Sequence, residues 1–480
     1  MSTAQLPDLA EPIEAERKPL SYVEINTHMP DLSTDNPTSR VAIIIGDSIV
    51  EISASSGAHY KYSENPLTSE DFALFCDLGD GKEVAVVCDG VGGEPGGEIA
   101  SREAAFALQL YLANNPDGGL ENAIRQVNRT FGLFRDFFHR HVANAISHKY
   151  PADEFDNQTE TQRFTRELCE YTTGMVDLTE APAVKKCNTQ DCFQEIKQDY
   201  KKEVDSIELD YNTILTELFS GKDILLSAFD PNDKLTLEPW QEVVMARLLL
   251  ATRIGQPLDV NIIPDKNNIE ELLRDQIALP PVVVRTEDGK PVRLEIRNSG
   301  MSTTLAAVLI DRNTNTTEIA NVGDASIFCG PNKVSTDHNI ADTIFSNPNI
   351  RSIEDKIRLL LANRNLVTST IGGRRSGMEV YCETIHHIPE TIMLTTDGVT
   401  DYIRFGNLLQ IPDHVLSRLS DDEREELDKA LKKLESRLNI SPNAEVTPAT
   451  VHAYVEDRSK IHNFGDHATV LTIQNRPVST

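Results

Sequence analysis

The sequence predicts an α+β fold in which two stacked antiparallel sheets are flanked by helices. Apolar strand patterns gather in two groups, near the start of the chain and again beyond residue 300, and long helical patterns lie between the groups. Strands that are separated from helices in this way favour α+β folds over doubly wound parallel sheets, where the two alternate. The chain has 480 residues, and at ~100–200 residues per domain this length accommodates two or three domains.

Composition places the chain among globular proteins and limits its partners. Hydrophobic residues make up 39% of the chain and charged residues 25%, which is ordinary globular usage. The formal net charge of −29 argues against nucleic acid or an anionic membrane as a partner and favours divalent cations. The seven cysteines are odd in number and form no CxxC pair, so we expect neither a disulfide framework nor a zinc knuckle.

The sequence predicts a cytoplasmic location. The first residues, MSTAQLPDLAEPIEAERKPL, have neither a basic start nor an apolar core, unlike a secretory signal. No run approaches the ~18 apolar residues of a membrane helix. Non-classical secretion into the cytosol of another cell stays open, because such export follows no composition rule of this kind.

The first group of elements follows residues 1–39, which are predicted to be an irregular tail because Pro, Ser, Thr and Asp dominate them. Two short apolar runs on either side of Gly79-Asp80-Gly81 are typical of a hairpin. Two patterns of helical period come after the glycine-rich loop. The predicted strands and helices of this group are Val41–Ser53, Phe72–Leu78, Glu83–Cys88, Glu98–Leu112 and Leu120–Ala145.

Residues 146–281 differ in character from both flanking parts. They are acidic, contain the only tryptophan, Trp240, and have helical patterns such as Phe193–Leu218 and Trp240–Ile254. We therefore predict a main domain in two parts, 40–145 and 282–480, with 146–281 as an acidic helical insertion. The strands predicted in the second part, with one polar helix at Asp421–Leu438, are Met301–Ile310, Glu318–Asn321, Ala325–Cys329, Met378–His386, Thr391–Thr396 and Ala468–Gln474.

Carboxylates stand at the points where predicted strands meet loops. Such charges are costly unless they are paired or bound to metal. Ligand sets of oxygen alone indicate Mg²⁺ or Mn²⁺ rather than zinc or copper. Two such ions about 3.5–4 Å apart lower the pKa of a shared water and hold it in line with phosphorus, which is metal-assisted hydrolysis. The carboxylates in question are Glu70, Asp71, Asp89, Asp397 and Asp466.

Together these segments resemble the type 2C (PPM) metal-dependent protein serine/threonine phosphatases in their bacterial style. VAVVCDGVGGEPGGEIAS, at Val84–Ser101, is similar to the family's central Asp-Gly-x-Gly-Gly motif and the helix after it. Six further segments resemble, in the family's order, its Ser-Gly-x-Thr, Asn-x-Gly-Asp-Ser, Thr-x-Asp-His, flap-closing, Ser-Asp-Gly-Leu and Asp-Asn-x-Thr motifs. They are SGMSTTLAAVLI (Ser299–Ile310), IANVGDASIFCG (Ile319–Gly330), VSTDHN (Val334–Asn339), LVTSTIGG (Leu366–Gly373), TIMLTTDGVTDYI (Thr391–Ile403) and GDHATVLTI (Gly465–Ile473). The resemblance covers about 40–135 and 282–480, and it leaves out the insertion.

The resemblance implies an α-β-β-α sandwich with two Mg²⁺ or Mn²⁺ ions at one end. It implies that Asp89 bridges both ions and that the Gly90 carbonyl binds one of them. The activity implied is hydrolysis of phosphoserine and phosphothreonine in proteins. The other implied roles are binding of the second ion by Asp397 and Asp466, orientation of metal-bound water by Glu70 and Asp71, and binding of a third, weaker ion by Asp324.

Two positions depart from the family's pattern. Pro66 stands where members often carry an arginine that grips the substrate phosphate, and Lys61 is the nearest upstream cation. A lysine supplies a point charge but no bidentate fork, so Lys61 is expected to be a weak phosphate ligand. Val91 stands where animal-type members carry a histidine, so the resemblance implies that metal-bound water protonates the leaving group.

Three functions therefore stay open at the level of sequence. The first is an active phosphoprotein phosphatase. The second is a pseudophosphatase that binds or scaffolds with the same fold, which Pro66 and the large insertion favour. The third is a phosphatase of a small phosphorylated molecule. The acidity of the insertion suggests a basic phosphoprotein substrate or a separate protein partner.

Overall fold

A computed structural model supplies the structure of the protein, and the tail and much of the insertion lie outside its described residues. The described residues are 38–45, 48–55, 69–91, 96–149, 163, 195, 198, 209–226, 232–277, 283–285, 291–293, 301–363, 366–373, 378–400, 411, 413–438, 447–458 and 467–475.

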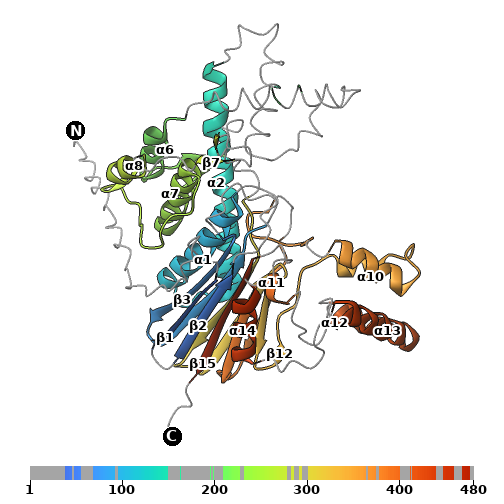
Figure 1. The fold of residues 1–480 in the computed structure, drawn as a ribbon. Helices are drawn as coiled ribbons and strands as arrows, with labels where there is room; N and C mark the ends of the chain where they lie inside the picture. The colour runs from blue at the N-terminus through green and yellow to red at the C-terminus, as the bar shows by residue number, and fades with distance from the viewer. Residues whose placement is uncertain are drawn as a thin grey trace, which may run out of the picture.

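Antiparallel pairing builds two large sheets (Figure 1). The six-stranded sheet contains, in spatial order, β1 (Thr38–Ile45), β2 (Ser48–Ser55), β15 (Ala468–Asn475), β14 (Thr391–Thr395), β11 (Ser326–Cys329) and β12 (Asn332–Lys333). The five-stranded sheet contains β13 (Tyr381–Ile385), β10 (Thr316–Val322), β9 (Leu305–Asp311), β4 (Lys82–Asp89) and β3 (Asp71–Gly79).

The two sheets stack because each has an apolar face that the other covers. Side chains alternate along a strand, and in β4 both sets are apolar. Ala85 and Val87 join the core between the sheets, whereas Val84 and Val86 join the core under the helices. This double burial explains why the predicted strand at Glu83–Cys88 reads as a continuous apolar run.

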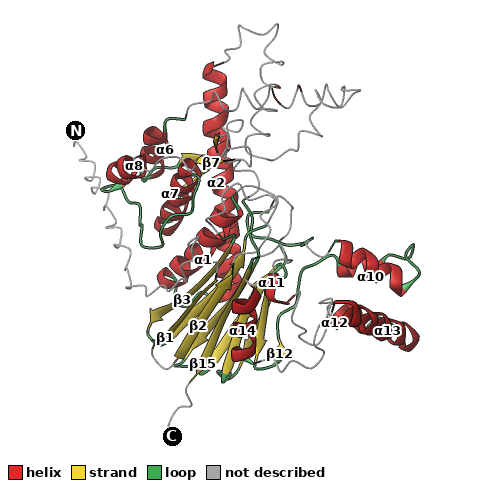
Figure 2. Ribbon diagram, in the orientation of Figure 1, coloured by secondary structure: helices red, strands yellow, loops and turns green. Residues whose placement is uncertain are grey.

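Helices cover both outer faces of the stack (Figure 2). On the five-stranded sheet lie α1 (Gly97–Asn114) and α2 (Leu120–Lys149). On the six-stranded sheet lie α14 (Pro448–Arg458) and the single turn α11 (Asp397–Thr400). The predicted α+β fold, with an α-β-β-α sandwich, is therefore confirmed.

One predicted strand is wrong in detail. The run Val41–Ser53 contains two strands, because β1 and β2 pair as antiparallel neighbours with Ile45 opposite Ser48. Gly46-Asp47 is a two-residue hairpin signal, which the β-branched residues on either side obscured. The hairpin of β3 and β4 and the two helices that follow it are confirmed.

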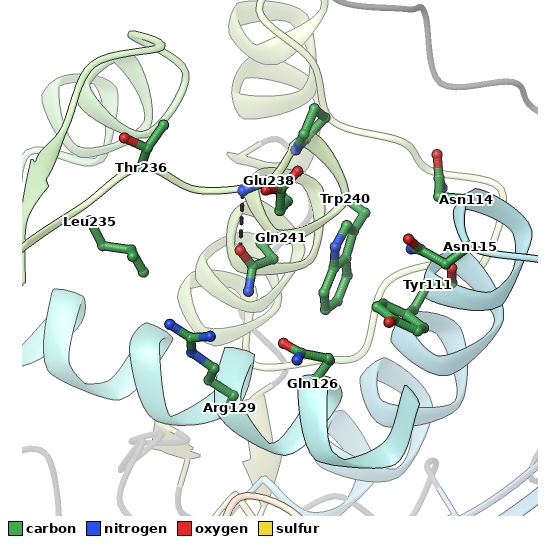
Figure 3. Close-up of a pocket in the computed structure, with 11 residues that line it drawn as sticks. Tyr111, Asn114, Asn115, Gln126, Arg129, Leu235, Thr236, Glu238, Trp240 and Gln241 are labelled. Atoms are coloured by element: carbon green, nitrogen blue, oxygen red, sulfur yellow. Dashed lines mark hydrogen bonds between the residues drawn. The ribbon is translucent and has the colours of Figure 1, made fainter. Parts of the chain in front are cut away.

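Helix α7 (Pro239–Ile254), within the predicted insertion, packs on α1 and α2 and shares their apolar core. Its Trp240 meets Tyr111 of α1 edge-on, with 5.2 Å between the ring centroids (Figure 3). This helix therefore forms an extra layer outside α1 and α2. The domain boundaries at 146 and 281 are not tested by this packing and stay predictions.

A fully buried ion pair fixes α7 to α1. Arg247 donates to both carboxylate oxygens of Glu103, at 2.7 and 2.8 Å, and neither side chain is exposed. The guanidinium also donates to the carbonyls of Asp259 and Ile262 in the loop after α7, and it lies 4.0 Å from the centroid of the Phe106 ring. Each charge is thereby compensated, as burial requires.

The remaining helices form smaller groups. Four helices make a separate apolar cluster beside the sandwich (Figure 1): α9 (Ala341–Ser346), α10 (Ile353–Ala362), α12 (Asp413–Leu416) and α13 (Asp421–Leu438). The others are α6 (Tyr211–Leu218), α8 (Ile269–Ile277) and the short strands β5 (Ile224–Leu225), β6 (Lys234–Leu235), β7 (Val283–Arg285) and β8 (Pro291–Arg293). Among the described residues, no helix combines the length and apolarity needed to cross a bilayer.

We predict that Arg247→Met lowers the free energy of unfolding by about 3–5 kcal/mol, because the substitution leaves Glu103 as an unpaired buried charge. The matched control is Arg125→Met, which removes the exposed ion pair with Glu121 of α2 and should cost less than about 1 kcal/mol. Urea unfolding followed by circular dichroism measures both. Equal losses for the two variants would contradict the prediction.

Stability is also expected to fall below neutral pH because of His452 in α14. This side chain is fully buried, with Nδ1 at 2.8 Å from Ser53 Oγ and Nε2 at 2.9 Å from Thr472 Oγ1. Burial, aided by the charge of Arg40, lowers its pKa to about 4. The unfolded chain binds the proton near pH 6.5, so stability is intact above that pH and is lost as the pH falls toward 4, by roughly 3 kcal/mol in all.

Urea unfolding at several pH values between 7.5 and 5 measures this loss. His452→Gln should flatten the slope, whereas the exposed His148 can be changed to Gln without effect on it. A slope that His452→Gln leaves unchanged would show that other groups cause it.

Candidate metal centre

The predicted site carboxylates that the structure describes lie at or next to strand ends that share one end of the sandwich. The register of β3 with β4 and of β4 with β9 puts the start of β3, the end of β4 and the start of β9 side by side. In the other sheet, the end of β14 lies between the starts of β11 and β15. The antiparallel ladders alone therefore gather these positions.

Asp71 and Asp89 are direct neighbours across the β3–β4 pair. Beside them, the Gly90 N–H donates to the Glu70 carbonyl at 3.0 Å, which extends the ladder by one step. Asp71 is 4% exposed, so its charge is largely removed from water. Like charges that face each other across a strand pair repel, and this arrangement therefore favours a cation or several hydrogen-bond donors nearby.

The backbone of Asp89 is held by the segment before β9. Its carbonyl accepts hydrogen bonds from Thr304 N at 2.8 Å and from Thr303 Oγ1 at 2.7 Å, and its N–H donates to Thr304 Oγ1 at 3.3 Å. Both threonines are buried. The Ser-Gly-x-Thr-like segment thus fixes the position of Asp89.

Asp397 is brought near Asp71 because the residue before it, Thr396, is hydrogen-bonded to Asp71. The Thr396 hydroxyl donates to Asp71 Oδ2 at 2.9 Å, which connects the two sheets. Thr396 Oγ1 also accepts a hydrogen bond from Thr469 N at 3.0 Å, and Thr396 N donates to the Thr469 carbonyl at 3.1 Å. Asp397 follows as the first residue of α11 and is 8% exposed.

Asp324 lies at the same end, in the turn between β10 and β11. The turn passes close to Thr304, since a Cβ on Gly323 would stand 2.7 Å from its side chain, and Gly323 has a φ of +88° that suits glycine. Gly323 N donates to Nδ1 of His338 at 3.2 Å, and burial lowers the pKa of His338. A neutral His338 therefore carries its proton on Nε2.

The glycine after Asp89 has a packing role that its sequence context did not reveal. A Cβ on Gly90 would stand 2.3 Å from the carbonyl carbon and oxygen of Gly97, the first residue of α1. Only glycine at position 90 allows the two backbone segments to pass at this distance, whereas a Cβ on Gly97 would stand 3.2 Å from the carbonyl carbon of Gly90. The start of α1 is therefore tied to the end of β4.

Some of the predicted site is not described. Asp466 and Lys61 lie outside the described residues. Within the described part of the chain, no three His, Cys, Asp or Glu side chains stand close enough together to hold an ion. The described carboxylates do fit a hard divalent cation in the type of donor, because they offer oxygen alone.

Two cavities flank α2. One, of about 600 Å³, is lined by Arg125 and by residues around His338 and Glu379. The other, of about 570 Å³, lies between α1, α2 and the start of α7 (Figure 3). Its polar lining includes Gln126, Arg129 and Glu238, and none of the predicted site residues that the structure describes lines it.

The sequence reasoning missed Thr303, Thr304 and Thr396 as parts of the site. Their motifs are visible in the chain, but hydroxyls next to strand ends are common and carry no metal signal. Their importance comes from the register of strands that are far apart in sequence.

Comparisons with known proteins give structural neighbours only. No protein-family model and no curated protein matches the chain. A solved serine/threonine phosphatase, Stp1 from Staphylococcus aureus, is 12% identical, with 94% of this chain and 98% of that chain covered and a TM-score of 0.32. The S. agalactiae serine/threonine phosphatase is 12% identical, with 92% and 100% covered and a TM-score of 0.34. Serine-threonine phosphatase 2C from Toxoplasma gondii is 12% identical, with 92% and 100% covered and a TM-score of 0.32.

Gly90→Ala is expected to lower the free energy of unfolding by about 1–3 kcal/mol or more, because the added methyl group forces apart two backbone segments. Gly132→Ala in α2 is the control, since its Cβ would meet only Arg135 Nη2, at 4.0 Å. In a helix that change should stabilise by up to about 1 kcal/mol. Thermal and urea unfolding compare them, and a Gly90→Ala protein as stable as the wild type would refute the close approach.

Proposed function

We propose that the chain is a metal-dependent phosphatase that hydrolyses phosphoserine and phosphothreonine in proteins. The single observation that supports this most is the convergence of Asp71, Asp89 and the Thr396–Asp397 turn at one end of two sheets. That arrangement puts residues of three separate sequence motifs at the same end of the sandwich, which supports the proposed centre.

Each proposed role is assigned to an oxygen ligand or a charged group that the chain itself supplies. Asp89, with its backbone held by Thr303 and Thr304, would bridge two Mg²⁺ or Mn²⁺ ions, and the Gly90 carbonyl would bind one of them. The ions would supply a water of lowered pKa for attack on phosphorus. The remaining proposed roles are binding of the second ion by Asp397 and Asp466, of a third ion by Asp324, orientation of water by Glu70 and Asp71, and weak phosphate binding by Lys61.

The proposed partners follow from charge. A chain with a net charge of −29 attracts basic regions of phosphoproteins and repels polyanions. The acidic region 146–281 is the proposed contact for such a substrate or for a separate protein partner. Because α7 of this region shares the core of α1 and α2, a partner bound there would contact the same body that carries the carboxylates. A cytoplasmic location remains part of the proposal.

Asp89→Asn should lower Mn²⁺-dependent hydrolysis of p-nitrophenyl phosphate by more than about 100-fold, the upper end of the loss seen when outer partners of a metal site are removed. The control is Asp77→Asn, near the far end of the paired strand β3, where the side chain accepts a hydrogen bond from Gly79 N. That variant should keep wild-type turnover.

The assay includes the wild type with and without Mn²⁺, and calorimetry with Mn²⁺ alone. Wild-type protein that binds Mn²⁺ but hydrolyses neither p-nitrophenyl phosphate nor a phosphopeptide would favour a pseudophosphatase. A folded wild type that binds no Mn²⁺ would refute the proposed centre, and turnover in Asp89→Asn would refute the role of Asp89.

A further inference from the structure

We propose that the Thr396 hydroxyl is the positioning group that orients Asp71 toward the metal ions and ties the two sheets together at the site. The inference rests on the proposed function, and it assigns a role to a residue that the sequence motifs do not. Thr396 is completely buried and lies between the end of β14 and the first residue of α11.

The hydrogen bonds around Thr396 fix the direction in which its hydroxyl donates. Its oxygen accepts from Thr469 N at 3.0 Å, so the single O–H proton is directed to Asp71 Oδ2 at 2.9 Å. A hydroxyl offers one donor and two acceptor positions, and both kinds are engaged here. One side chain thus joins β3 of the five-stranded sheet to β14 and β15 of the six-stranded sheet.

The location makes this bond more than a general stabilising contact. Asp71 faces Asp89 across the strand pair, so its carboxylate is pushed away from its neighbour by like charge. The Thr396 donor gives Asp71 Oδ2 a fixed partner in the opposite sheet and so selects one orientation of the carboxylate. Outer partners of this kind orient the groups around a metal, and their loss typically weakens metal affinity or activity 10–100-fold.

The chain offers a matched control in the preceding residue. Thr395 is also completely buried, yet among the described residues its Oγ1 has no hydrogen-bond partner. Thr→Val at either position removes a hydroxyl and keeps the volume and the β-branch. The two variants therefore differ in the hydrogen bonds that the lost hydroxyl makes: Thr396 loses those with Asp71 and Thr469 N, and Thr395 loses none.

The test compares wild type, Thr396→Val, Thr396→Ser and Thr395→Val. Calorimetry with Mn²⁺ alone gives metal affinity, and p-nitrophenyl phosphate hydrolysis at saturating Mn²⁺ gives kcat and KM separately. We expect Thr396→Val to weaken Mn²⁺ binding and to lower kcat, each by about 10–100-fold, with KM unchanged. Thr396→Ser, which keeps the donor, should restore both to within about threefold of wild type, and Thr395→Val should match wild type.

A double-variant comparison tests whether Thr396 acts through Asp71. In an Asp71→Ala background, Thr396→Val should change Mn²⁺ affinity, and any remaining kcat, by less than about twofold, because the carboxylate that Thr396 positions is already gone. Full additivity of the two changes would overturn the inference.

The remaining outcomes separate the inference from the proposed function. An active wild type whose Thr396→Val variant binds Mn²⁺ and turns over normally overturns the positioning role alone. Equal losses in Thr395→Val and Thr396→Val also overturn it, because packing would then explain both. If the wild-type protein is folded but neither binds Mn²⁺ nor hydrolyses p-nitrophenyl phosphate, the proposed function is wrong, and the role proposed for Thr396 is then wrong as well. Should circular dichroism show Thr396→Val unfolded, Thr396→Ala is judged by the same criteria.

Discussion

The contacts at this end of the molecule depend on two carboxylates that face each other across one strand pair. Asp71 and Asp89 are opposite partners in the β3–β4 ladder, and neither can move away without breaking the register that also buries the apolar residues of both strands. The surrounding structure accommodates their repulsion instead. Thr303 and Thr304 hold the backbone of Asp89, and Thr396 holds the side chain of Asp71 from the other sheet.

Much of the fold and of the candidate site follows from local sequence signals. Strands such as Glu83–Cys88 are apolar on both faces, the turn at Gly79–Gly81 is explicit, and α1, α7 and α13 have clear helical patterns. An Asp at the end of an apolar strand is expensive, and several such positions in one chain indicate a shared ligand. That physical cost is why the sequence singles out Asp71, Asp89 and Asp397 as candidates, and their role as metal ligands stays a prediction.

Other features depend on contacts that no local pattern encodes. The β1–β2 hairpin was hidden because two β-branched strands flank a short turn signal and read as one run. The tie from Thr396 to Asp71 joins positions far apart in sequence, and only the stacking of two sheets brings them within hydrogen-bond distance. The close passage of Gly90 and Gly97 likewise brings together a residue after β4 and the first residue of α1, which no local pattern announces.

The buried pair of Glu103 and Arg247 constrains how such a chain diverges over time. While α7 stays in place, a change of either residue alone leaves the other as a buried charge without its partner. We therefore expect positions 103 and 247 to change together, or not at all, in any chain that keeps this helix packed on α1.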